Sequence, residues 1–282
     1  MGITEGTRAA EAAGTPYTVS PAAARRRTLL RAGSYAVPAA VVLLAVLTAD
    51  RARLADQFAR LSLAGTMFPE VLTVALLNTV LYTAGGFVFG LVLGLGIAVM
   101  RLSGVRLYRW LAMAYIEVFR GLPALLVFVF VGVGVPLAFP GVHFPGGVYG
   151  QVTFALGLVA AAYMAETIRA GIEAVPRGQW EAARSLGMSH GRALVSVVAP
   201  QAFRIVVPPL TNELILLFKD SSLVLFLGVT LQDRELTKFG QDMASASANT
   251  TPIVVAGCCY LLITVPLSVL VRRLERRNHR MR

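Results

Sequence analysis

Long uncharged, mostly apolar runs dominate the chain and predict helices that cross a membrane. Such a helix needs roughly 20 mostly apolar residues. The pattern predicts about six of them, the third and fourth by dividing one long uncharged run at its central prolines and glycines. The predicted spans are 32–49, 71–100, 107–137, 150–172, 205–231 and 252–271. The fold class that follows is an all-α polytopic membrane helix bundle.

The segments outside these spans complete the expected organisation. Residues 1–31 are rich in Ala, Thr, Gly and Arg and are predicted to form a disordered basic arm. A cleaved signal peptide also has basic residues before an apolar run, but this arm is long and no clear A-x-A site follows. We therefore expect 32–70 to be a retained span with its outside loop, 71–272 the main transmembrane domain, and 273–282 a basic tail.

The basic residues indicate the orientation. With the N-terminus inside, the four inside segments carry 19 of the 26 basic residues and the outside segments carry six; Arg120 lies within a span. Cytoplasmic loops of membrane proteins carry an excess of Lys and Arg. Both termini are therefore predicted to be cytoplasmic.

Composition supports a membrane protein. The chain is 56% hydrophobic and 15% charged, with a mean hydropathy of +0.68 and a net charge of +11, whereas a soluble domain has about 25% charged residues. A soluble enzyme is therefore excluded. Nucleic acid is not expected as a partner, because the basic residues are divided among loops between spans instead of forming one soluble basic face.

The chain lacks the patterns of the common catalytic and metal sites. G-x-x-x-x-G-K-[ST], the nucleophile elbow and H-E-x-x-H are absent. The three histidines, His143, His190 and His279, are scattered over both expected faces. We expect no enzyme activity, no metal and no cofactor in this chain.

The longest inside loop, 174–200, predicts two short helices at the membrane face. Pro176 suits a helix start, Gly187 suits a helix end, and a second helix is expected over 189–198, before Pro200. On this pattern alone, the loop is either an interfacial anchor or a docking surface for a cytosolic partner.

This loop resembles the EAA loop of permease subunits of ABC importers. The residues that match are Glu181, Ala182, Ala183 and, after three further residues, Gly187. The family pattern continues to an Ile and a Leu-Pro, where this chain has Val197 and Ala199 before the matching Pro200.

Other stretches resemble the polar amino-acid branch of that family, which serves histidine, glutamine, glutamate, arginine and opines. The resemblance covers about 70–275. Two departures are Leu122, where many relatives have Thr, and Ser221, where Thr is commoner. The stretches are LLNTVLYT from Leu76, EVFRGLP from Glu117, YMAETIRAGI from Tyr163, LTNE from Leu210 and FKDSSL from Phe218.

The resemblance implies a five-helix permease core of type I importer kind, with an extra N-terminal span. It implies ATP-driven import of polar amino acids across a bacterial plasma membrane. The implied partners are a cytosolic ABC ATPase dimer that holds ATP and Mg and grips Glu181 to Gly187, a second permease subunit, identical or homologous, and an extracytoplasmic binding protein. The alternative is a stand-alone secondary carrier or channel, although such carriers often show internal repeats and matching halves are not visible here.

Polar residues in the fifth span predict a substrate path. Ionisable residues inside a membrane are costly and commonly functional, and an amino acid needs partners for its ammonium and carboxylate. The predicted path residues are Asn212, Glu213 and Ser221, then Asp220 and Lys219, which could instead pair with each other, with Asn78 and Thr79 on the second span. Structural hydrogen bonds between helices are the alternative reading. Pro208-Pro209 predicts a bend or break near the start of the fifth span.

Two ion pairs are expected at the cytoplasmic ends of the third and fourth spans. Glu117 and Arg120 are three residues apart, as are Glu166 and Arg169, so each pair shares a helix face. They are either local salt bridges or an inner gate whose members exchange partners. On the second span, Gly86, Gly90 and Gly94 predict close helix packing, within the chain or against a partner permease.

Overall fold

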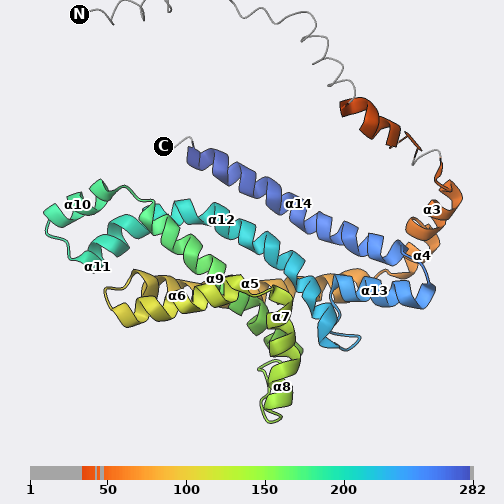
Figure 1. Ribbon diagram of the computed structural model, residues 1–282, viewed down its shortest axis with the longest axis horizontal. Helices are drawn as coiled ribbons and strands as arrows, with labels where there is room; N and C mark the ends of the chain where they lie inside the picture. The colour runs from red at the N-terminus through yellow and green to blue at the C-terminus, as the bar shows by residue number, and fades with distance from the viewer. Residues whose placement is uncertain (1–33, 42, 45–47, 280–282) are drawn as a thin grey trace, which may run out of the picture. The chain divides into compact units, whose positions relative to one another are not determined.

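A computed structural model describes residues 34–41, 43–44 and 48–279, and every regular element within these ranges is helical (Figure 1). The chain divides into two units, residues 1–55 and 56–282. In the first unit, residues 34–41, 43, 44 and 48 are helical, inside the expected span 32–49, part of which lies outside the described residues along with the expected arm 1–31.

The second unit holds the long apolar helices. It includes all elements after α3 (Arg51–Phe58), which spans the division. In chain order these are α4 (Leu61–Thr66), a π-helical segment (Val71–Leu76), α5 (Leu77–Leu102), α6 (Arg106–Gly121), α7 (Ala124–Val129), a π-helical segment (Phe130–Gly134), α8 (Val135–Ala138), α9 (Val148–Glu173), α10 (Arg177–Ser185), α11 (His190–Ala193), a π-helical segment (Leu194–Val198), α12 (Ala199–Asp220), a 3-10 segment (Ser221–Leu227), α13 (Leu236–Ser247) and α14 (Thr251–His279).

Among the described residues, four helical segments are long and apolar enough to cross a membrane. They are Val71–Leu102, Val148–Glu173, His190–Leu227 and Thr251–Arg276. The expected spans 71–100, 150–172 and 252–271 fall inside three of them, and the helix expected at 205–231 begins much earlier, at His190. A fifth crossing is present if the bent pair α6 and α7–α8 is one span, so the expected count of six is not established.

The third expected span, 107–137, is bent instead of straight. Its two parts, Arg106–Gly121 and Ala124–Ala138, meet at an angle of 104°. Pro123 lacks a backbone N–H and disfavours helical backbone at the residue before it, and Leu122 is accordingly extended, with φ −89° and ψ 138°. The bend brings this short connection next to α9 and α12.

Pro208 and Pro209 do not break the fifth span, so that part of the expectation is wrong. Helix α12 continues through both prolines. Each proline removes one helical N–H donor. Neighbouring helices commonly make such internal prolines tolerable in membrane helices.

The inside loop 174–200 contains the two expected short helices. Gly187 has a φ of +81°, the left-handed conformation that glycine adopts at helix ends. The Ser189 hydroxyl accepts a hydrogen bond from the backbone N–H of Arg192 and caps α11. The second helix does not end before Pro200, because it passes through the π-helical segment into α12, where proline occupies the first turn.

Helices α5 and α9 approach closely along the three predicted glycines. A Cβ atom added to Gly90 would lie 2.9 Å from the Ala160 Cβ, and one added to Gly94 would lie 2.9 Å from the carbonyl oxygen of Ala161. Gly86 faces Leu156 in the same way. The expectation of packing is confirmed, and the packing is within the chain.

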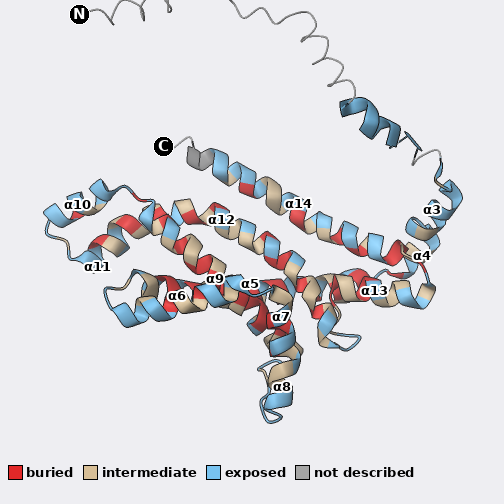
Figure 2. Cartoon of the chain, in the orientation of Figure 1, coloured by how far each residue is buried: buried red, intermediate tan, exposed pale blue. Residues whose placement is uncertain are grey.

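The outer faces of these helices remain apolar and exposed. Figure 2 shows buried residues concentrated on α9 and exposed residues along α14. Val92 on α5 is 69% exposed and Leu262 on α14 is 73% exposed. Within a bilayer such faces can contact lipid or other membrane helices, because they place no unpaired polar group against the lipid.

The helix contact makes a direct prediction about stability. Gly94→Ala should lower the free energy of unfolding by about 1–3 kcal/mol, because the added methyl group meets the α9 backbone and the helices must separate. Gly96→Ala is the matched control on the same helix, since a Cβ there meets nothing within 4 Å. Equal unfolding temperatures of the two purified variants in detergent would contradict the close contact.

Candidate functional site

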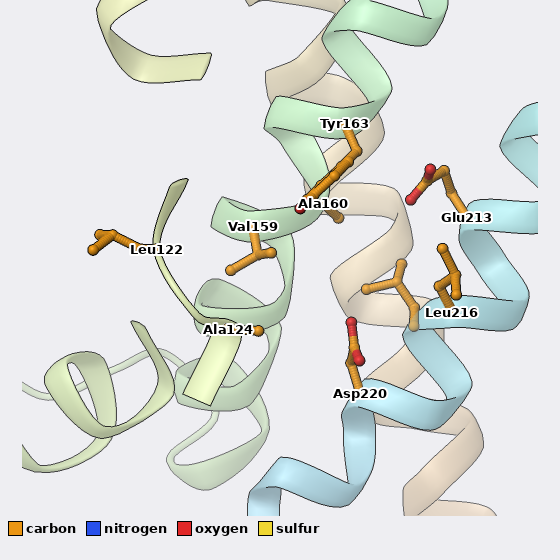
Figure 3. A pocket seen from close by; sticks show the side chains of 9 residues that line it. Leu122, Ala124, Val159, Ala160, Tyr163, Glu213, Leu216 and Asp220 are labelled. Carbon is orange, nitrogen blue, oxygen red and sulfur yellow. The ribbon is translucent and has the colours of Figure 1, made fainter. Parts of the chain in front are cut away.

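A cavity of about 200 Å³ lies where α9, α12 and the connection between α6 and α7 meet (Figure 3). Its walls are mostly apolar, and its polar groups are two carboxylates and one phenol. The lining residues are Leu122, Ala124, Val159, Ala160, Tyr163, Glu213, Leu216, Leu217 and Asp220.

Glu213 and Asp220 are the acidic groups of the cavity. They are seven residues apart on α12, about two helical turns, and therefore share one face. Figure 3 shows both side chains on the cavity side of α12, on either side of Leu216. Within the described part of the chain, neither carboxylate has an ion-pair or hydrogen-bond partner. Unpaired carboxylates within a membrane-spanning helix are costly, so the cavity is suited to a positively charged group.

Tyr163 forms the opposite wall from α9 and brings a cation to the edge of the cavity. The guanidinium carbon of Arg120 lies 5.5 Å from the centre of the Tyr163 ring. This is within the range of a cation–π interaction. Arg120 belongs to the last turn of α6, directly before the bend that places Leu122 and Ala124 on the cavity wall.

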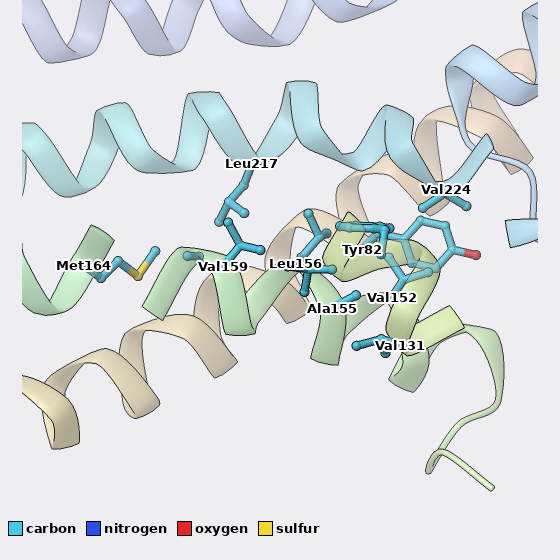
Figure 4. Close-up of a cluster of buried hydrophobic side chains, with 12 residues drawn as sticks. Tyr82, Val131, Val152, Ala155, Leu156, Val159, Met164, Leu217 and Val224 are labelled. Carbon is cyan, nitrogen blue, oxygen red and sulfur yellow. The ribbon is translucent and has the colours of Figure 1, made fainter. Parts of the chain in front are cut away.

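A compact apolar cluster extends from the cavity along α9. Val159 and Leu217 belong to both the cavity wall and this cluster. Figure 4 shows Tyr82, Val152, Leu156 and Val224 continuing the cluster away from the cavity. Tyr82, Val152 and Val224 have no exposed surface. The packing holds α9 and α12 at a fixed separation, and so fixes the width of the cavity.

The other predicted residues of α12 lie elsewhere. Asn212 and Lys219 are exposed and form a second face of the helix, beside the one that carries Glu213 and Asp220. The buried Ser221 donates a hydrogen bond to the carbonyl of Phe218 at 2.7 Å. Lys219 and Asp220 make no ion pair in the part of the chain that the structure describes, so that alternative is not realised here.

Asn78 and Thr79 tie α5 to the loop before α13. The Asn78 amide donates to the carbonyls of Gln232, at 2.7 Å, and Arg234, at 3.0 Å. The Thr79 hydroxyl accepts the backbone N–H of Leu236 at 3.1 Å. Both side chains are buried and neither lines the cavity. Their role in the path stays a prediction, while their hydrogen bonds give them a structural one.

Glu235 is a buried acid that the sequence reasoning missed. Its side chain has no exposed surface. It caps α13 by accepting the backbone N–H groups of Thr237 and Lys238, each at 2.6 Å, and it accepts the Tyr260 hydroxyl at 2.8 Å. Burial raises the pKa of this carboxyl, and the hydrogen bonds oppose the rise. Glutamate is not among the preferred N-cap residues, so the sequence carried no clear signal for it.

The two predicted ion pairs behave differently. Arg169 binds Glu166 at 2.9 Å and Glu173 at 2.5 Å, so the local salt bridge on α9 is confirmed. Glu117 is exposed and forms no ion pair with Arg120 among the described residues. Arg120 instead lies over Tyr163, and its charge acts on both Glu166 and Glu213. The expected partner exchange at a gate is not tested by this arrangement.

The residues of the EAA-like loop form a partly exposed helix. Ala183 is buried, while Glu181, Ala182 and Gly187 are exposed on α10 and its end. On the buried side, Trp180 stacks on His190 with ring centres 4.7 Å apart. The helix is thus held on one side and open on the other.

Residues 86–280 match the family described as binding-protein-dependent transport system inner membrane component. Over 215 residues, the chain is 36% identical to the probable glutamine ABC transporter permease protein GlnM of Bacillus subtilis, covering 75% of this chain and 93% of the relative. It is 35% identical over 213 residues to the glutamate/aspartate import permease protein GltK of Escherichia coli O6:H1, covering 72% of this chain and 91% of the relative.

Solved structures give the same fold. A crystal structure of an amino acid ABC transporter with histidines matches with a TM-score of 0.68 and 33% identity, over 77% of this chain and 97% of that one. The MetNI methionine ABC transporter in an inward-facing conformation matches with a TM-score of 0.63 and 20% identity, over 75% of this chain and 97% of that one. The second match concerns the fold alone.

Glu235 makes a prediction about pH. The pKa of the Glu235 carboxyl is raised in the folded state above its ordinary value of about 4.5. The contribution of this shift to the free energy of unfolding is therefore complete below pH 4.5, and it is lost as the pH rises through the raised pKa. Glu235→Gln stays neutral at every pH. The unfolding temperature of the wild type, measured relative to Glu235→Gln in detergent, should therefore fall as the pH rises above 4.5.

The exposed Glu70→Gln is the control, since Glu70 caps no helix through its side chain. Its unfolding temperature should follow that of the wild type across the pH range. A difference between wild type and Glu235→Gln that is independent of pH would contradict the shifted carboxyl.

Proposed function

The chain belongs to the family of binding-protein-dependent transport system inner membrane components, and we propose that it conducts polar amino acids through the cavity lined by Glu213 and Asp220. It is an integral membrane permease subunit of an ABC importer, a family whose members work with an ATPase and a binding protein.

The two unpaired carboxylates facing one cavity carry this proposal. An amino acid entering the membrane brings an ammonium group that must keep an anionic or hydrogen-bonding partner. Glu213 and Asp220 supply two such partners on one face of α12, and no cation of the chain's described residues satisfies them by an ion pair. A bound ammonium group would complete the site.

The substrate class follows from what the relatives share. Those named above are permeases for glutamine and for glutamate and aspartate, and a further one, of Corynebacterium glutamicum, is an arginine permease. Their side chains differ in charge, so the common element is the polar α-amino acid itself. The mostly apolar wall of the cavity, with two carboxylates and one phenol, is compatible with recognition of that common element.

The exposed side of α10 supports a docking role. Glu181, Ala182, Ala183 and Gly187 lie on or at the end of a short helix whose buried side is fixed to the bundle. An ATPase that grips Glu181 and the neighbouring exposed surface would move α10, and α10 is connected to α9 and α12, the two helices of the cavity wall. ATP and Mg would be held by that ATPase and not by this chain.

The proposed importer contains further subunits and has a defined orientation in the membrane. An ATPase dimer, a second permease subunit, identical or homologous, and an extracytoplasmic binding protein complete the importer in a bacterial plasma membrane. The α10–α11 pair and the start of α6 lie at one end of the second unit, and α13 lies at the other (Figure 1). This supports placing the arginine-rich ends of the second unit on the cytoplasmic side, and the distribution of basic residues along the sequence places both termini there as well.

Replacement of the cavity acid tests the path. Glu213→Gln should lower import of the transported amino acid about tenfold or more, because a hydrogen bond to a charged group contributes about 1.5–3 kcal/mol. The measurement is uptake of radiolabelled L-glutamine, L-arginine and L-glutamate by the complete importer in proteoliposomes.

The exposed Glu70→Gln outside the cavity is the control and should import at the wild-type rate. If Glu213→Gln imports as fast as Glu70→Gln for every solute that the wild type carries, the solute does not use this cavity.

Reversal of the loop charge tests the coupling. Glu181→Arg should abolish ATP-dependent uptake and prevent co-purification of the ATPase, because a longer, positively charged side chain replaces the carboxylate at the proposed docking surface. Glu275→Arg is the control, as an exposed charge reversal at the end of α14. Uptake that survives Glu181→Arg and needs no ATP would instead support the stand-alone carrier or channel.

A further inference from the structure

Arg120 is a cation without a counter-ion at the edge of the cavity. Its guanidinium carbon lies 5.5 Å from the centre of the Tyr163 ring, and Tyr163 lines the cavity. Within the described ranges of the chain, Arg120 makes no ion pair and no hydrogen bond through its side chain. The five N–H donors of the guanidinium are therefore available to an anion that approaches along the ring.

The two neighbouring cations act on acids other than Glu213. Arg169 is held by Glu166 and Glu173 in two ion pairs. Lys219 is exposed, as Arg120 is, and its charge acts on Asp220. Arg101 acts electrostatically on Glu166 but is not among the groups that act on Glu213. Arg120 is the arginine whose charge reaches Glu213.

The bend at Pro123 fixes Arg120 beside the cavity. Arg120 occupies the last turn of α6, and the chain turns by 104° within the next four residues. Leu122 and Ala124, two and four residues further on, are part of the cavity wall. The cation is thus positioned by the same bend that closes one side of the cavity.

The two signs of charge lie on different walls. The carboxylates come from α12, whereas the guanidinium comes from α6 and rests over a ring of α9. The charge of Arg120 acts on Glu213, and the two residues form no ion pair in the part of the chain that the structure describes. An α-amino acid carries an ammonium and a carboxylate on adjacent atoms, so it can satisfy both walls at once.

We propose, on the basis of the function above, that Arg120 binds the carboxylate of the transported amino acid and is the residue that restricts the cavity to zwitterionic α-amino units. Arginine suits this role because its planar guanidinium can meet a carboxylate with two parallel hydrogen bonds. Tyr163 supports the guanidinium from below by its ring face. The cavity then selects for both charged groups of the solute, whatever its side chain.

An amine that lacks the α-carboxylate tests the role of Arg120. An amine that lacks the carboxylate keeps its partners at Glu213 and Asp220 but leaves Arg120 without an anion. Removing the Arg120 side chain should therefore lower the affinity for the amino acid and leave the affinity for the amine unchanged. Removing the charge of Glu213 should lower both affinities, because both ligands carry the ammonium.

The experiment measures binding to the permease–ATPase complex in detergent, without the binding protein. The ligands are two radiolabelled pairs whose amine carries no carboxylate: L-arginine and agmatine, and L-glutamine and 4-aminobutanamide. For the pair whose amino acid the importer carries, the wild type should bind the amino acid about tenfold to a hundredfold more tightly than the amine. In Arg120→Ala this ratio should collapse towards one, with the affinity for the amine unchanged.

Arg120→Lys and Arg106→Ala are the matched variants. Lysine keeps the positive charge and should keep part of the ratio, whereas Arg106 is an exposed cation at the start of α6 and its removal should change nothing. The role of Arg120 would be overturned if Arg120→Ala lowered the affinities for amino acid and amine equally, or left the ratio of the two affinities unchanged. If Arg120→Ala binds neither ligand and lysine restores both equally, Arg120 is merely structural.

The same data distinguish failure of the proposed path. If Glu213→Gln binds both ligands as the wild type does, the cavity is not the amino-acid site, and the role of Arg120 falls with it. If Glu213→Gln loses both ligands while Arg120→Ala loses neither, the path stands and only the assignment of Arg120 is wrong.

Discussion

The close approach of α5 and α9 is the contact on which the rest of the membrane unit depends. Gly90 and Gly94 let the backbones come so near that a single added methyl group would lie 2.9 Å from the facing helix. In a bilayer, burial of apolar surface does not drive helices together, so helix association depends on close packing. Larger side chains at these glycine positions would hold the helices apart and weaken that packing. Helix α9 then presents Tyr163 and Val159 to the cavity from a fixed position.

Polar groups have different surroundings in two parts of the membrane unit. Near the start of α5, Asn78 and Thr79 find backbone partners in the loop before α13, and the buried Glu235 caps that helix. In the cavity, by contrast, Glu213 and Asp220 have no partner among the described residues. Buried polar groups in lipid normally find partners within the protein. The hydrogen-bonded groups near α13 therefore stabilise the fold, and the carboxylates of the cavity are the groups that the proposed solute would bind.

Much of the arrangement could be predicted from local pattern. The apolar runs located the spans beginning at Val71, Val148 and Thr251 within a few residues, and the glycine spacing predicted the close packing. The helix pair of the inside loop followed from Gly187 and the helix formers before it. Glu213 was found because a charge within an apolar run is conspicuous.

The misses arise where tertiary contacts decide. Nothing in the sequence around Asn212 and Glu213 says which of the two neighbours faces α9, because that depends on the rotation of α12. The prolines at 208 and 209 signal a break, yet the helix continues where neighbours support it. In the sequence Glu235 looks like an ordinary acidic loop residue, because its partner Tyr260 lies 25 residues later and contacts it only in the folded chain. Arg120 was paired with its sequence neighbour Glu117, while the structure places it over Tyr163 on another helix.

We propose that the solute occupies the cavity between Tyr163, Glu213 and Asp220 of this chain. Cryo-electron microscopy of the complete importer with the amino acid it carries tests this directly. Solute density is expected in this cavity, with the ammonium toward α12. Well-ordered solute density elsewhere in the membrane region, with this cavity empty, would contradict it.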